Sequence, residues 1–219
     1  MQHYWFNKQN NKKLIIFFCG WSFDYNPFKF LDCGDYDVIT LYDYASLDFD
    51  IDFSKYEQIH LIGWSMGVFI ASYLKDKLPE LTSAVAVCGT ALPVDDELGI
   101  PHKSFELSLI HAEKGLQGKF TRNVFVEDDL LARYEKTPVE RSIENRVNEL
   151  VKLDELIKSY KFEFKPLYTK ALVGVKDKII PTKNQLNFWH KYNVPVIELD
   201  SGHFPFYNYK SWEEILLCK

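Results

Sequence analysis

Residues 58–75 read QIHLIGWSMGVFIASYLK, and this stretch decides the fold. Its apolar first part predicts a buried strand, and its last part predicts a helix. Between them lies a G-x-S-x-G sequence centred on Ser65, which in this strand-to-helix context predicts a sharp turn that exposes a nucleophilic serine. The glycines at positions 63 and 67 leave room for so tight a turn. The alternative is an ordinary turn with an idle serine, and the flanking strand and helix favour the functional interpretation.

Composition narrows the class of protein. The chain has 219 residues, 47% of them hydrophobic, which suffices for one core with an inserted subdomain. The net charge of −5 argues against a dedicated nucleic-acid binder. We see no signal peptide, and the longest apolar run near the start, residues 14–19, is too short to span a bilayer. The four cysteines form no C-x-x-C pair. We therefore expect a soluble cytoplasmic protein with reduced cysteines, no metal, and no membrane or nucleic-acid partner.

Short apolar runs alternate with helical patterns along most of the chain. The runs that predict strands are residues 14–19, 38–42, 59–62, 84–88, 171–175 and 194–199. Such apolar strands with helices between them predict an α/β fold with a mostly parallel sheet covered on both faces. The alternation breaks where amphipathic-helix patterns occur, at residues 103–114, 129–136 and 139–156. We therefore expect a core formed by residues 1–91 and 166–219, with a helical lid inserted at residues 92–165.

A nucleophilic serine needs a base, and the base needs an orienting acid. Asp177 and His203 follow the last two predicted strands. Because the carboxyl ends of parallel strands share one edge of a sheet, Ser65, Asp177 and His203 can converge there as a catalytic triad. Taken singly, Asp177 could be a helix cap and His203 an ordinary core or surface histidine. Asp95 and Asp96, which follow another predicted strand, are the alternative acid.

Acyl transfer also needs two N–H donors for the oxyanion. The first is expected from the backbone of Met66, the residue after Ser65. The second is expected from the backbone of Trp21, where Gly20 permits a tight turn after the first predicted strand. The Trp21 side chain is free to pack beneath the lid, because only its backbone is needed. The expected substrate-binding residues are Trp21, Ser65, Met66, Phe120 and His203.

Three separated motifs now agree, and they span nearly the whole chain. They are Phe18-Cys19-Gly20-Trp21, Gly63-Trp64-Ser65-Met66-Gly67 and Ser201-Gly202-His203-Phe204-Pro205-Phe206. With these motifs the sequence resembles the α/β-hydrolase superfamily and, within it, the BioG family of pimeloyl-[acyl-carrier-protein] methyl ester esterases. One departure is that many relatives carry His-Gly where this chain has Cys19-Gly20, which affects side-chain contacts in that loop but not the backbone donor.

The resemblance implies a serine carboxylesterase of biotin precursor synthesis that needs no cofactor. Its substrate would be a pimeloyl methyl ester on an acyl carrier protein, and the reaction would pass through an acyl-enzyme on Ser65. A small-molecule carboxylesterase, a thioesterase and a non-catalytic binding module of the same fold are the alternatives.

The basic residues of the lid suggest where such a carrier protein would dock. Every arginine of the chain lies in the lid, at Arg122, Arg133, Arg141 and Arg146. Acyl carrier proteins are acidic, and the planar guanidinium group binds carboxylate and phosphate through paired hydrogen bonds. With Lys119, these arginines are the expected docking residues. The alternative is a solvated helical face on which neighbouring acids pair with the arginines.

Overall fold

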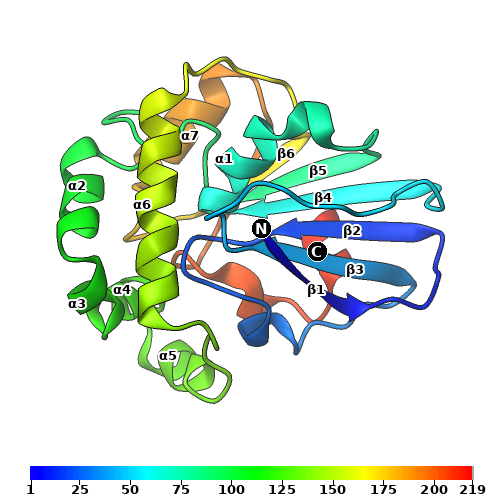
Figure 1. Ribbon diagram of the computed structural model, residues 1–219, viewed down its shortest axis with the longest axis horizontal. Coiled ribbons are helices and arrows are strands. Elements are labelled where there is room, and N and C mark those ends of the chain that lie inside the picture. The colour runs from blue at the N-terminus through cyan, green and yellow to red at the C-terminus, as the bar shows by residue number, and fades with distance from the viewer. Residues whose placement is uncertain (219) are drawn as a thin grey trace.

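A central sheet organises the computed structural model, which describes residues 1–218 (Figure 1). In this part of the chain the strands lie in the order β1-β3-β2-β4-β5-β6-β7. Their bounds are β1 Gln2–Asn7, β2 Lys13–Phe18, β3 Tyr36–Tyr42, β4 Gln58–Trp64, β5 Ser83–Val87, β6 Lys170–Gly174 and β7 Val196–Leu199. β1 pairs antiparallel with β3, and the other neighbouring strands pair in parallel. The predicted α/β fold with a mostly parallel sheet is confirmed.

Helices cover the sheet and the edge at which its parallel strands end. The α-helices are α1 Met66–Tyr73, α2 His102–Ile110, α3 Ala112–Leu116, α4 Lys119–Val124, α5 Asp128–Tyr134, α6 Ile143–Ser159, α7 Thr182–Lys191 and α8 Trp212–Leu217. Short 3-10 helices occur at η1 Asn26–Phe28, η2 Lys75–Lys77 and η3 Pro205–Asn208. Figure 1 shows α2 to α6 gathered beyond the ends to which the parallel strands point. We call residues 92–165, which include these five helices, the lid segment. Within residues 1–218, no helix has the length and apolar character needed to cross a membrane.

The two faces of the sheet bury separate apolar clusters, because side chains alternate along each strand. In β2, Leu14, Ile16 and Phe18 pack on one face, in a cluster with side chains of α1, α6 and α7. Ile15 and Phe17 pack on the other face, in a cluster with side chains of η1, η3 and α8. Every residue of β2 after the first is buried, as the continuous apolar run predicts for a strand covered on both faces.

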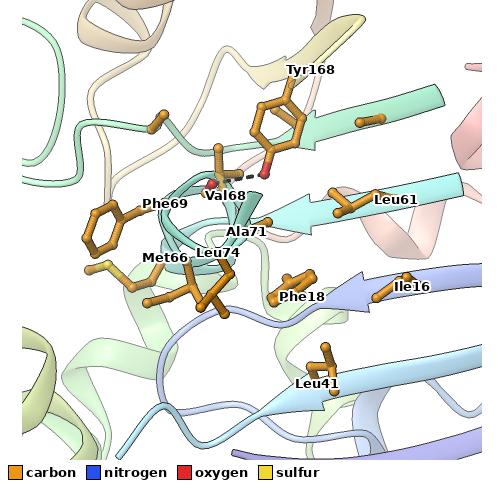
Figure 2. Close-up of a cluster of buried hydrophobic side chains, with 14 of the residues drawn as sticks. Ile16, Phe18, Leu41, Leu61, Met66, Val68, Phe69, Ala71, Leu74 and Tyr168 are labelled. Carbon is orange, nitrogen blue, oxygen red and sulfur yellow. Dashed lines mark hydrogen bonds between the residues drawn. The ribbon is translucent and has the colours of Figure 1, made fainter. Parts of the chain in front are cut away.

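Figure 2 shows the cluster that seats α1 on the sheet. Val68 of α1 belongs to the same buried cluster as Phe18 of β2 and Leu61 of β4. The Tyr168 hydroxyl donates a 2.9 Å hydrogen bond to the Val68 carbonyl oxygen. Fully burying a side chain of this size contributes roughly 1.5–3 kcal/mol, so the cluster holds the first turn of α1 firmly. It thereby also fixes Ser65, the residue just before this helix.

The structure contains elements that the sequence patterns do not predict, and some predicted elements have different ends. Strand β1 has no counterpart among the predicted strands, because it lies at the edge of the sheet and has no continuous apolar run. Helix α6 begins at Ile143 rather than near Val139, because Ser142 caps it by accepting a hydrogen bond from the Asn145 N–H. Helix α1 begins at Met66, directly after the serine of the G-x-S-x-G motif.

Candidate active site

Ser65 lies on a strained turn between β4 and α1. Its backbone adopts φ 54° and ψ −124°, a conformation that costs a non-glycine residue of order 1–3 kcal/mol. Its N–H donates to the Val87 carbonyl oxygen over 3.0 Å, which anchors the turn to β5. A Cβ on Gly63 would lie 2.5 Å from the Tyr168 hydroxyl, and one on Gly67 would collide with the Phe18 carbonyl oxygen. The two glycines therefore admit the close packing that surrounds this serine.

The structure brings Ser65, His203 and Asp177 into one chain of hydrogen bonds. His203 Nε2 lies 2.8 Å from Ser65 Oγ, and His203 Nδ1 lies 2.7 Å from Asp177 Oδ2. The His203 side chain is 2% exposed and that of Asp177 is fully buried, which shields their interaction from water. Because the carboxylate can only accept at Nδ1, the proton of a neutral imidazole lies there and leaves Nε2 free to accept from the serine.

Asp177 is held on both of its carboxylate oxygens. Oδ1 accepts the N–H groups of Ile179 and Ile180 over 2.8 and 3.0 Å. Oδ2 accepts a further 2.9 Å hydrogen bond from Gln185 Nε2, beside the one from His203. Gln185 is a buried residue of α7 that we did not predict from the sequence, and no motif marks it.

Trp64 holds the backbone of His203 in place, because its indole N–H donates a 2.8 Å hydrogen bond to the His203 carbonyl oxygen. This tryptophan lies inside the G-x-S-x-G motif, yet the motif alone gives no sign of this contact.

The alternative acids have other partners. Asp95 accepts hydrogen bonds from the N–H groups of Glu97 and Leu98, so it stabilises a local turn. Asp96 lies on the surface, where its carboxylate is 3.3 Å from His102 Nδ1. Within residues 1–218 neither carboxylate contacts His203, so the geometry favours Asp177 as the orienting acid.

The two expected oxyanion donors lie at the same site. Met66 is the first residue of α1, so its N–H lacks an intrahelical acceptor and lies at the positive end of the helix dipole. Trp21 lies on the loop after β2, and a Cβ on the adjacent Gly20 would be 3.2 Å from Ser65 Cβ. Among the described residues, neither the Trp21 nor the Met66 N–H donates to a protein group. Both backbone donors are thus available to a ligand.

A cavity of about 600 Å³ opens beside these groups. Its lining includes all five expected substrate-binding residues, Trp21, Ser65, Met66, Phe120 and His203. Apolar side chains such as Phe105, Leu116 and Leu150 form much of the rest, with Lys119 and Lys178 among the polar ones. The Trp21 and Phe120 rings meet edge to face with their centroids 4.8 Å apart. An apolar cavity with a few polar groups next to a nucleophile suits an acyl chain.

Two cysteines lie on loops next to the site but are not competing nucleophiles. Burial raises the pKa of the Cys88 thiol well above its ordinary value, and the Asp177 carboxylate raises it further. Burial likewise raises the pKa of the Cys19 thiol. Because the thiolate is the reactive form of cysteine, both side chains remain protonated and unreactive near neutral pH. Residues 1–218 hold no cluster of three or more side chains suited to binding a metal ion.

The lid arginines do not all face solvent, and the prediction that Arg141 and Arg146 dock a carrier protein is wrong. The Arg141 side chain is 5% exposed and forms ion pairs with Asp43 and Glu149, at 3.2 and 2.8 Å. Arg146 is 6% exposed and donates to the Ser22 hydroxyl. Both guanidinium groups are used inside the protein, so neither can contact a partner on the surface.

The other three docking candidates remain accessible. Arg122 is half exposed and lies 2.6 Å from Asp128. Arg133 stacks on the rings of Phe30 and Tyr207, at 4.5 and 4.0 Å from their centroids. Lys119 lines the cavity. Lys119 and Arg122 lie on α4 and Arg133 lies on α5, and of the three only Lys119 lines the cavity.

The serine, the histidine and the carboxylate lie where the strands of a mostly parallel sheet end, next to free N–H donors and an apolar cavity. The fold and this site define a carboxylic ester hydrolase of the α/β-hydrolase class. The chain belongs to the family described as "Pimeloyl-ACP methyl esterase BioG", whose family model matches residues 1–215.

Solved structures agree with this assignment. The crystal structure of BioG from Haemophilus influenzae is 30% identical in sequence, with a TM-score of 0.91, over 98% of this chain and 99% of that one. An esterase from Exiguobacterium antarcticum shares the fold with a TM-score of 0.66 at 18% identity, over 94% of this chain and 90% of that one.

A relative known by sequence is the "Malonyl-[acyl-carrier protein] O-methyltransferase" of Bacteroides fragilis, which is 35% identical over 198 residues. The match covers 88% of this chain but only 40% of that relative, so the chain spans less than half of its length.

Proposed function

We propose that this protein hydrolyses the methyl ester of a pimeloyl chain on an acyl carrier protein, for the synthesis of biotin. The observation that carries the proposal is the hydrogen-bonded chain Ser65–His203–Asp177 at the wall of an apolar cavity, in a member of the BioG family. The name of the Bacteroides relative adds support. It describes transfer of a methyl group to an oxygen of malonyl-[acyl-carrier protein], which forms a carrier-bound methyl ester, and the proposed reaction hydrolyses an ester of this kind.

The first half of the proposed reaction forms an acyl-enzyme. Ser65 Oγ attacks the ester carbonyl carbon while His203 Nε2, 2.8 Å away, takes its proton. The carbonyl oxygen becomes an oxyanion and accepts the N–H groups of Trp21 and Met66. Asp177 stabilises the imidazolium that forms and keeps the ring oriented. His203 then returns the proton to the departing methoxide, which leaves as methanol.

The second half releases the acid. Water takes the place of methanol, and His203 Nε2 removes one of its protons as the oxygen attacks the acyl-enzyme carbonyl. The same two N–H groups stabilise the second oxyanion. When this intermediate collapses, the proton on His203 passes to Ser65 Oγ, and the free carboxylic acid leaves. Every proton is carried by His203, so the cycle needs no group beyond the three side chains and the two backbone donors.

The cavity and its surroundings support a long, tethered acyl substrate. Apolar lining side chains such as Phe105 and Leu116 suit the methylene chain between the ester and the carrier attachment. Lys119, Arg122 and Arg133 are the accessible basic residues that we propose for docking the acidic carrier. Arginine suits this partner because its planar fork pairs with carboxylate or phosphate.

The experiment compares the purified protein on two substrates, pimeloyl-carrier-protein methyl ester and the same ester on a small thiol. The Ser65→Ala variant is the control. We expect serine-dependent release of methanol, with a much higher kcat/KM on the carrier-bound ester. The charge-reversal variant Arg122→Glu should reduce the rate on the carrier substrate and leave the rate on the small ester unchanged.

Other results would reject or change the proposal. Hydrolysis that survives in Ser65→Ala, or its absence in the wild type, would reject it. Equal rates on both substrates would favour a small-molecule carboxylesterase, and cleavage of the thioester bond instead of the methyl ester would favour a thioesterase.

A further inference from the structure

The loop that carries Trp21 is bonded at four consecutive residues to the segment that begins α6. The hydrogen bonds run from Trp21 Nε1 to Arg146 O (2.9 Å), from Ser22 N–H to Glu149 Oε2 (3.1 Å), from Arg141 Nη1 to Phe23 O (3.1 Å), and from the N–H groups of Glu140 and Arg141 to Asp24 Oδ2 (2.6 and 3.2 Å). The partners lie more than 110 positions apart in the sequence. The lid segment therefore fixes this loop through a set of polar contacts rather than through one anchor.

Glu149 is the centre of this set. Its side chain is fully buried, and its second oxygen accepts the Tyr44 N–H over 3.0 Å. The Tyr44 hydroxyl in turn donates to the Cys19 carbonyl oxygen over 2.6 Å. One carboxylate thus ties together the loop after β2 and the loop after β3. Arg141 Nη1 lies 2.8 Å from Glu149 Oε2 and balances its charge.

The loop needs outside contacts because its backbone is in a disfavoured conformation. Ser22 has φ 74°, in the left-handed region that non-glycine residues rarely adopt. Its hydroxyl accepts from Arg146 Nη2 over 2.8 Å and from Nε over 3.2 Å, and its N–H is held by Glu149. The side chains of α6 therefore hold Ser22 at both its backbone and its hydroxyl group.

We propose that Glu149 is a positioning residue that, together with Arg146, holds the Trp21 N–H where the oxyanion forms. This inference rests on the proposed acyl transfer by Ser65. Neither Glu149 nor Arg146 is among the described residues that line the cavity, so both act through the loop and do not touch the substrate. An oxyanion donor works only when it is aimed in advance, since a donor that must reorient during the reaction loses most of its effect.

The test is Glu149→Gln, which keeps the shape of the side chain but places an NH₂ group against groups that are all donors. We expect kcat on p-nitrophenyl butyrate to fall about 10- to 100-fold, with KM within about twofold of the wild type, because removing a whole oxyanion donor costs about 10²- to 10³-fold. The affinity for a trifluoromethyl ketone, whose adduct with Ser65 carries an oxyanion, should fall by a similar factor.

A matched control separates positioning from stability. Asp37 is also a fully buried carboxylate that accepts two backbone N–H groups, those of Gln9 and Asn11, and it lies near the amino end of β3, away from the site. Asp37→Asn should lower the thermal midpoint without changing kcat or ketone affinity at a temperature where it is folded. If Glu149→Gln does not fold, Ser22→Ala replaces it, since that change removes only the hydroxyl that accepts from Arg146.

Two results would overturn the inference. In the first, Glu149→Gln or its replacement keeps the kcat and ketone affinity of the Asp37→Asn control. In the second, Glu149→Gln or its replacement changes KM but leaves kcat at the value of the wild type. Failure of the proposed acyl transfer would look different, since the wild type itself would then show no Ser65-dependent hydrolysis of p-nitrophenyl butyrate. Failure of the proposed carrier-bound substrate alone would leave this test unchanged, because p-nitrophenyl butyrate has no carrier.

Discussion

Replacing Asp177 by asparagine tests the proposed triad most directly. The carboxylate of Asp177 accepts two backbone N–H groups on Oδ1 and two side-chain donors, from His203 and Gln185, on Oδ2. An asparagine has one oxygen and one NH₂ group. If its oxygen keeps the backbone pair, its NH₂ faces His203 Nδ1 and Gln185 Nε2. The imidazole then avoids a clash of two donors only by moving its proton to Nε2, where it can no longer accept the proton of Ser65.

The expected loss in kcat is about 10³- to 10⁴-fold, which corresponds to roughly 4–5.5 kcal/mol in the barrier. The assay is steady-state hydrolysis of p-nitrophenyl butyrate, with thermal unfolding measured beside it. The matched control is Asp95→Asn, since Asp95 only caps a local turn and should leave kcat within about twofold. A kcat for Asp177→Asn within tenfold of the wild type, or an equal loss in Asp95→Asn, would refute the assignment.

Three further changes test the packing and the electrostatics around the site. Arg141→Met should lower the free energy of unfolding by about 3–5 kcal/mol, because it leaves the buried carboxylates of Asp43 and Glu149 unpaired. The control Arg122→Met, on the surface, should change the free energy of unfolding by less than about 1 kcal/mol when both variants are compared by urea denaturation. Gly63→Ala should reduce both stability and activity, because its methyl group would displace the Tyr168 hydroxyl, and a variant with wild-type kcat and thermal midpoint would contradict this account. Burial lowers the pKa of His60, so below about pH 6.5 the unfolded chain binds a proton that the folded protein does not. The free energy of unfolding should therefore decrease as the pH decreases through this range. Thermal midpoints measured between about pH 7.5 and 5 should decrease less steeply in His60→Gln than in the wild type.

The fold and the site differ in how far the sequence predicts them. The strands, the turn at Ser65 and the positions of Asp177 and His203 follow from patterns that the backbone itself imposes, because glycines and apolar runs mark where strands end. The sheet order then brings these strand ends to one edge. Strand β1 does not follow from these patterns, because an edge strand needs no continuous apolar run.

The residues that hold the site could not be found in this way. Gln185 reaches Asp177 from another element, and Trp64 reaches His203 from 139 positions away, with no spacing rule that links them. Polar anchors of this kind depend on the packed structure and leave no local pattern in the sequence. They follow from the requirement that buried polar groups have hydrogen-bond partners, which can be applied only to the packed structure.

Helix α6 shows most clearly why the burial of charged residues does not follow from the sequence pattern. Its buried residues are Arg146, Glu149, Leu150 and Leu153, a stripe with helical spacing in which two of the four members are charged. Amphipathic reasoning assigns charged residues to the solvated face, so the sequence pattern gives no sign that Arg146 and Glu149 are buried. Burial of a charge is stable only when partners satisfy it, and here those partners are the loops after β2 and β3.

This arrangement divides the lid segment into two parts with different physical roles. Leu150 and Leu153 of α6 belong to the same buried cluster as side chains of β2 and α1, and the polar side chains of α6 hold the loop after β2 at Ser22. Helices α2, α3 and α4 instead supply most of the lid residues that line the cavity, and they hold few buried side chains. A movement that admits substrate costs least where few buried contacts must break. Opening is therefore expected in α2 to α4, while α6 stays with the sheet and keeps the loop that carries Trp21 in place.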